Sequence, residues 1–218
     1  MSTREGRILD LDSWKRRQHF EFFRHYEKTW FNICADVDVT ALVAHCAEPD
    51  GPSFFLASLW LSLEAANGVE ELRYRLHGDQ VVVHPVIHGG STVLMPDETF
   101  AFAYFDYHPT YPAFTAEAAP VLDKVKNGPG GLEPEPDRDD LIHYSVIPWV
   151  AFSSFSHARV RTRDVSVPKI VFGKHRPVGD RRLLPVSVEV HHALVDGLHV
   201  GRFYERFEEL AGRPELLY

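Results

Sequence analysis

The segment from His191 to Gly197 carries residue types at a spacing suited to acid–base chemistry. It reads His-His-Ala-Leu-Val-Asp-Gly. A histidine can take a proton from a hydroxyl group near neutral pH, and an aspartate four residues later can fix the loop that carries it. The preceding residues alternate, so His192 shares one face of a predicted strand with the valines at 186, 188 and 190. His192 is therefore the candidate general base.

The residues after this segment predict a helix. Apolar side chains recur at helical spacing from Val200 to Ala211, with charged residues between them, and Gly212-Arg213-Pro214 ends the pattern. Asp196 stands where it could cap this helix, and a carboxylate at that position also interacts favourably with the helix dipole. The strand ends at a histidine and the helix begins at an aspartate, which defines a short loop between them.

The remaining sequence alternates between strand and helix patterns. Helices are predicted at 13–28 (capped by Asp12 or Ser13), 40–48, 53–69 and 113–126, and strands at 30–39, 72–76, 81–86, 91–95, 100–106, 142–148, 149–155, 170–172 and 184–192. A Gly- and Pro-rich loop is expected at 127–137. We therefore predict an α+β fold in one domain, 1–218, with a two-layer arrangement in which helices cover one face of a mixed sheet.

Composition excludes several classes of protein. The chain has 23 Lys and Arg against 31 Asp and Glu, a formal charge of −8, and no basic run, so we expect no nucleic-acid partner. No apolar run approaches the ~20 residues of a membrane span, and the charged N-terminus does not resemble a signal peptide. With only two cysteines, we expect no disulfide framework and a soluble protein of the reducing cytoplasm.

Metal chemistry is also not expected. His191 and His192 are neighbours on a strand, so their side chains point to opposite sides and cannot share a metal ion. His175 and His199 form no ligand spacing with them. The sequence has no Gly-x-Ser-x-Gly elbow and no phosphate-binding glycine loop, so an acyl-enzyme hydrolase and a nucleotide-binding protein lack support.

Four separated blocks, in the same order, resemble the chloramphenicol acetyltransferase family over nearly the whole length of the chain. They lie at 12–21, 98–100, 145–155 and 191–201. The resemblance implies that family's fold and an acetyl-CoA-dependent O-acetyltransferase, with chloramphenicol as the first acceptor to consider and antibiotic resistance as its effect. It also implies a homotrimer with active sites between subunits, and no metal.

The resemblance assigns roles to individual positions. His192 corresponds to the general base and Ser145 to the serine that stabilises the oxyanion, while Asp196 would pair with Arg16 in structural support. The donor coenzyme would lie near Trp149, Lys174 and His175. The positions that would bind the acceptor are Phe23, Phe100, Phe102, Phe155, His157 and Val171.

Several of these positions depart from the family pattern and leave the acceptor open. Phe102 and Val171 stand where Ala and Thr are usual, Leu132-Glu133 where Phe-Pro is common, and Phe23 where Tyr is common. Ser53 replaces a lysine expected near the coenzyme. The alternatives are the same chemistry on another hydroxylated small molecule, and a non-catalytic trimeric binding protein. A dihydrolipoyl acyltransferase core has a similar terminal motif but is expected to follow a lipoyl domain and linker.

Overall fold

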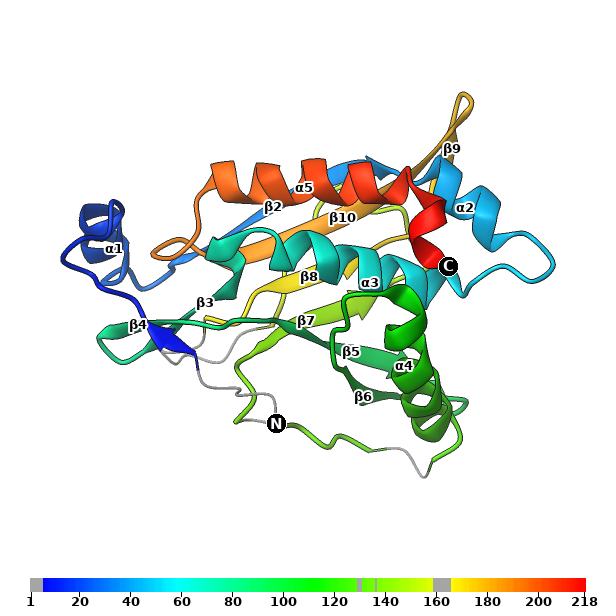
Figure 1. Cartoon of the computed structure of the whole chain (residues 1–218), viewed down its shortest axis with the longest axis horizontal. Coiled ribbons are helices and arrows are strands. Elements are labelled where there is room, and N and C mark those ends of the chain that lie inside the picture. The colour runs from blue at the N-terminus through cyan, green and yellow to red at the C-terminus, as the bar shows by residue number, and fades with distance from the viewer. Residues whose placement is uncertain (1–5, 129–130, 136, 159–165) are drawn as a thin grey trace.

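A mixed β-sheet of seven strands forms the centre of the computed structural model within its described residues, 6–128, 131–135, 137–158 and 166–218 (Figure 1). Its strands lie in the order β2-β10-β8-β7-β5-β6, and β9 pairs with β10. β7 is parallel to β5 and β8, and the other pairs are antiparallel. The bounds are β2 Trp30–Asp38, β5 His88–Leu94, β6 Phe100–Phe105, β7 Leu141–Val146, β8 Lys169–Phe172, β9 Arg176–Val178 and β10 Arg181–His191.

Helices cover one face of this sheet, which confirms the predicted α+β class (Figure 1). They are α2 Thr40–Cys46, α3 Phe54–Asn67, α4 Tyr111–Lys126 and α5 Gly197–Ala211, with a short 3-10 helix, η2, at Pro214–Leu217. α3 is buried around most of its circumference, whereas α5 buries one side, which includes Phe203 and Phe207. Gly89 lets α3 approach the sheet, because a Cβ there would lie 3.3 Å from the Leu63 side chain.

The opposite face of the sheet carries the polar side chains of the strands. His143 and Ser145 of β7 point to this face, since the intervening Tyr144 points to the helices and contacts the Ser62 hydroxyl. Residues 147–158 cross part of this face as an irregular segment. They are attached by hydrogen bonds from the Lys174 amide to the Val150 carbonyl and from Lys169 Nζ to the Ala158 carbonyl.

A small separate sheet is the main addition to the predicted architecture. β1 Arg7–Ile8, β4 Gln80–Val83 and β3 Tyr74–His77 form it in that order, after a short 3-10 helix, η1, at Glu70–Arg73. The expected hairpin is present, with Gly78 at φ 59° in its turn, a left-handed conformation that suits glycine. The hairpin pairs with the N-terminal strand rather than with the large sheet, so the prediction of one sheet was wrong on this point.

The first helix is shorter than predicted. α1 spans Arg17–Phe23, and neither Asp12 nor Ser13 caps it. Asp10 accepts hydrogen bonds from the Asp12 amide and the Ser13 hydroxyl instead, so these residues form their own turn before the helix begins.

The predicted strand at 149–155 is absent. Trp149 and Val150 would point to opposite faces of a strand, but both are exposed, so this segment has no buried face. β7 ends at Val146, and Pro148 follows shortly after. The other strands and helices occur where expected, within a few residues at their ends. In the part of the chain that the structure describes, no helix has the length and apolar character needed to cross a membrane.

Candidate active site

His192 follows directly after β10 and is enclosed by aromatic rings. Its imidazole stacks on Phe23, with ring centroids 3.9 Å apart, and lies 4.7 Å from the Phe31 ring. The His192 Nδ1 atom is 3.3 Å from the Val195 carbonyl oxygen. A proton on Nδ1 that is donated to this carbonyl leaves Nε2 as the free proton acceptor. The strand end and the loop together therefore orient a side chain suited to general-base chemistry.

Arg16 holds the loop that follows His192. Its guanidinium donates to both carboxylate oxygens of Asp196, at 2.8 and 2.5 Å, and to the carbonyls of His192 and Ala193. Burial alone would raise the pKa of Asp196, but the hydrogen bond and charge of Arg16 hold it below its ordinary value. Asp196 also caps α5 together with His199. One ion pair thus links the start of α1, the loop after His192 and the last helix.

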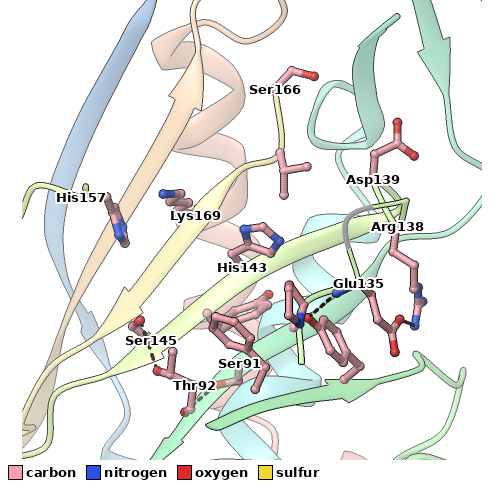
Figure 2. Close-up of a pocket in the computed structure, with 16 residues that line it drawn as sticks. Ser91, Thr92, Glu135, Arg138, Asp139, His143, Ser145, His157, Ser166 and Lys169 are labelled. Atoms are coloured by element: carbon pink, nitrogen blue, oxygen red, sulfur yellow. Dashed lines mark hydrogen bonds and ion pairs between the residues drawn. The ribbon is translucent and has the colours of Figure 1, made fainter. Parts of the chain in front are cut away.

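Ser145 lies in the middle of the sheet, beside Thr92, a residue that lines two cavities. The first cavity, of about 480 Å³, lies on the face away from the helices, and Ser145 is part of its wall (Figure 2). The second, of about 520 Å³, extends along β5 and the end of β7. Thr92 lines both cavities, and its Oγ1 is 3.4 Å from Ser145 Oγ. Thr92 therefore belongs to the walls of both cavities, and Ser145 lies beside it in the wall of the first.

The residues expected near the donor coenzyme line the second cavity. Trp149, Lys174 and His175 are all in its wall, and Ser53 faces it from the start of α3. Trp149 is 63% exposed, so its indole is available for stacking. Burial and the nearby charges of Arg182 and Lys174 lower the pKa of His175. This cavity combines an apolar wall with a cation, as a nucleotide-containing thioester would require.

The residues expected to bind the acceptor do not form one group within the chain. Phe102 and His157 line the first cavity, with Phe100 beside Phe102 and Phe155 beside His157, at ring distances of 5.9 and 4.8 Å. Phe23 lies instead on His192. Val171 is fully buried and is not a lining residue of that cavity.

His192 and Ser145 are also far apart in a single chain. Ser145 pairs with Val171, and Val171 pairs with Ser187, so Ser145 and Ser187 lie on one line across three strands. His192 is five residues beyond Ser187, about 16 Å along the strand, and the line itself spans about 10 Å. The two side chains are roughly 20 Å apart, so one chain cannot place both on the same substrate atom.

Comparison with known proteins identifies the family. The model of the chloramphenicol acetyltransferase family matches residues 6–208. The chain belongs to this family. Chloramphenicol acetyltransferase 3 of Escherichia coli is 33% identical over 93% of this chain and 95% of its own length. The chloramphenicol acetyltransferase of Streptomyces acrimycini is 35% identical over 96% of both chains.

Solved structures agree with this assignment. A chloramphenicol acetyltransferase superposes with a TM-score of 0.84 and 29% identity, over 94% of this chain and 99% of that chain. A dihydrolipoamide acetyltransferase of Azotobacter vinelandii, at 17% identity and a TM-score of 0.64, covers 89% of this chain and 86% of its own and shares the fold alone.

Sequence reasoning missed several residues of the first cavity. Thr92, His143 and Lys169 all line it, but none of them was assigned to the site from the sequence. Strand alternation carried the missing signal, because His143 is two residues before Ser145 and must share its face. Among the described residues, no group of three or more His, Cys, Asp or Glu side chains is placed to hold a metal ion.

Proposed function

We propose that the protein is an acetyl-CoA-dependent O-acetyltransferase that acetylates chloramphenicol in the cytoplasm and so inactivates the antibiotic. The observation that carries this proposal is that two cavities share Thr92, whose hydroxyl lies beside that of Ser145. A thioester in the second cavity and an alcohol in the first would bring their reacting atoms together beside a hydroxyl donor. Membership of the chloramphenicol acetyltransferase family supports the choice of donor and acceptor.

The chemistry follows from the two polar groups. His192 Nε2 takes the proton of the acceptor hydroxyl as its oxygen attacks the thioester carbonyl. The carbonyl oxygen becomes negative and accepts a hydrogen bond from Ser145 Oγ. When the carbon–sulfur bond breaks, the leaving thiolate takes the proton back from His192. The products are the acetyl ester and coenzyme A, and no covalent enzyme intermediate is needed.

The separation of His192 from Ser145 supports a homotrimer with sites between subunits. A second subunit must supply one of the two side chains, since about 20 Å separates them within a chain. Phe23 would then enter the acceptor site together with His192, on which it stacks. This arrangement also gathers the expected acceptor residues, which are divided between two regions of the single chain.

Release of free thiol from acetyl-CoA with chloramphenicol as acceptor tests the proposal. We expect turnover in the wild type and a loss of about 10²- to 10⁴-fold in kcat in His192→Ala. His19→Ala removes an exposed histidine from α1 and serves as the matched control with unchanged turnover. Equal turnover in wild type and His192→Ala would reject His192 as the base. A folded protein that binds acetyl-CoA but does not acetylate chloramphenicol would indicate another acceptor.

Phe102 favours this second possibility, acetylation of a different hydroxylated small molecule. The Phe102 ring occupies part of the first cavity, in a position where the family resemblance implies a smaller side chain. A larger side chain either costs about 1–3 kcal/mol of binding free energy or changes which ligand fits. A panel of alcohols with acetyl-CoA as the donor separates the two candidates by their kcat/KM values.

A further inference from the structure

Thr29, the last residue before β2, binds both members of the His191-His192 pair. Its carbonyl oxygen accepts a hydrogen bond of 2.7 Å from the His192 amide. Its hydroxyl oxygen lies 2.8 Å from Nε2 of the His191 imidazole, and both side chains are buried. The connection from α1 to β2 is therefore attached to the end of β10 through the backbone and through a side chain.

The side chains of the two histidines point to opposite sides of the strand end. The His192 ring lies beside the Phe31 ring, whereas the His191 ring lies beside the Trp30 indole, with centroids 5.3 Å apart. The Thr29 hydroxyl thus holds the strand end from the side away from the candidate base. Any effect of this hydroxyl on the base must pass through His191.

A series of hydrogen bonds leads from His191 to the imidazole of His192. The His191 carbonyl oxygen accepts from the amides of Leu194 and Val195, both at 3.0 Å, and these bonds form the turn after the strand. The Val195 carbonyl oxygen lies 3.3 Å from His192 Nδ1. A proton kept on Nδ1 by this carbonyl leaves Nε2 as the acceptor. The tautomer and direction of the base therefore depend on where His191 is held.

Arg16 holds the same loop at other atoms. Its guanidinium binds the Asp196 carboxylate and the carbonyls of His192 and Ala193. The His191 ring is held by Thr29 instead, and water does not readily replace a hydroxyl lost at a buried position. A buried imidazole nitrogen that loses its partner is destabilised in place, so the ring and the turn attached to it would shift.

We propose that Thr29 is a positioning residue for the general base: its hydroxyl fixes His191, and through the following turn it keeps His192 in the orientation and tautomer that proton transfer requires. The catalytic part of this inference rests on the proposed function. The positioning part concerns the turn alone and is measurable without turnover. Loss of the hydroxyl lowers the rate of the chemical step and leaves the binding of both substrates unchanged.

Amide hydrogen exchange measured by mass spectrometry tests the positioning. Thr29→Val replaces the hydroxyl with a methyl group, and peptides that cover residues 192–196 should exchange about tenfold faster, because they contain the amides bonded to the His191 carbonyl. Thr40→Val is the matched control. The Thr40 hydroxyl accepts from the Arg182 amide beyond the opposite end of β2, so its loss should leave exchange at 192–196 unchanged. Equal exchange in the wild type and Thr29→Val would overturn the proposal.

Steady-state thiol release tests the catalytic consequence. The kcat of Thr29→Val should fall about tenfold, while the KM values for acetyl-CoA and chloramphenicol stay within about twofold of wild type. Thr29→Ser retains the hydroxyl and should keep most of the wild-type kcat, and Thr40→Val should keep all of it. Thermal unfolding of each variant verifies that the fold is intact. An unchanged kcat in Thr29→Val, or an equally low kcat in Thr29→Ser, would overturn the proposal.

The two measurements separate failure of this inference from failure of the proposed function. If exchange at 192–196 rises in Thr29→Val but the wild type does not acetylate chloramphenicol, the positioning is supported and the proposed function is wrong. If the wild type is active and His192→Ala is not, while Thr29→Val equals the wild type in exchange and kcat, the proposed function stands and the role of Thr29 is rejected.

Discussion

At the scale of single residues, the pair Arg16–Asp196 holds the loop that follows His192. The guanidinium binds the carboxylate and two backbone carbonyls of the loop at once. Such a bidentate contact fixes direction as well as distance, which a lysine could not reproduce. We predict that Asp196 positions His192, so that its removal lowers activity through the loop rather than through contact with substrate.

Asp196→Asn should lower the free energy of unfolding by about 2 kcal/mol at neutral pH, because a charge-assisted hydrogen bond is weakened. Arg16 holds the pKa of Asp196 below its ordinary value, so the folded state favours the ionised form. The stabilisation is fully present above the unfolded pKa of about 3.9 and is lost as the pH falls through the folded pKa. Urea denaturation of both proteins from pH 7 to 3 measures the difference.

Asp50→Asn is the control, because Asp50 is exposed and has no ion pair among the described residues. Its unfolding free energy should equal that of the wild type over the whole pH range. If the difference in unfolding free energy between Asp196→Asn and the wild type stays constant down to pH 3, ionisation of Asp196 does not stabilise the fold. If the difference in unfolding free energy depends on pH but kcat is unchanged, the ion pair stabilises the fold without positioning the loop for catalysis.

At the scale of elements, Arg75 joins the small sheet to the large one. This β3 residue is completely buried, and its guanidinium donates to the carbonyls of Leu72, Tyr74, Asp139 and Leu141. The last two lie at the start of β7, the strand of His143 and Ser145. Burial lowers the pKa of Arg75 to about 10, against the opposing effect of Asp139 and Asp140, so it remains charged at neutral pH.

Arg75→Met should lower the free energy of unfolding by about 3 kcal/mol or more, since it leaves buried carbonyl groups without partners. Urea denaturation measures this loss. Arg181→Met removes an arginine that is 62% exposed and should change the same quantity by no more than about 0.5 kcal/mol. Similar effects of the two substitutions would show that Arg75 does not join the sheets.

The local patterns of the sequence predicted most elements but not their connections. β10 and α5 were predictable because alternation and helical spacing extend over many residues. The start of α1 was not, since the side chain of Asp10 accepts a hydrogen bond from the Asp12 amide and residues 10–13 form a turn before the helix. The pairing of β1 with β4 joins residues more than 70 positions apart, and no local pattern specifies such a partner.

At the scale of the whole molecule, the sequence predicts which residues belong to the candidate site but not how far apart they lie. The family resemblance implied the types and roles of His192 and Ser145, and strand alternation implied which face each occupies. Their separation depends on the register across β7, β8 and β10, which the sequence does not state.

A mixed assembly tests whether the site is divided between subunits. His192→Ala and Ser145→Ala each inactivate every site of a pure assembly under the proposed mechanism. When the two variants are unfolded together in equal amounts and refolded, half of the chains supply an intact histidine and half supply an intact serine. If each site takes one residue from each of two neighbours in a closed ring, about a quarter of the sites regain both groups.

The expected activity of the mixture is therefore about a quarter of that of wild type refolded in the same way. Refolding the variants separately and mixing them afterwards is the control, and it should give no activity because the subunits do not exchange. A site within one chain predicts no recovery in either experiment, since every chain lacks one of the two groups. Recovery only on joint refolding would thus establish both the division of the site and the need for an oligomer, without a structure of the assembly.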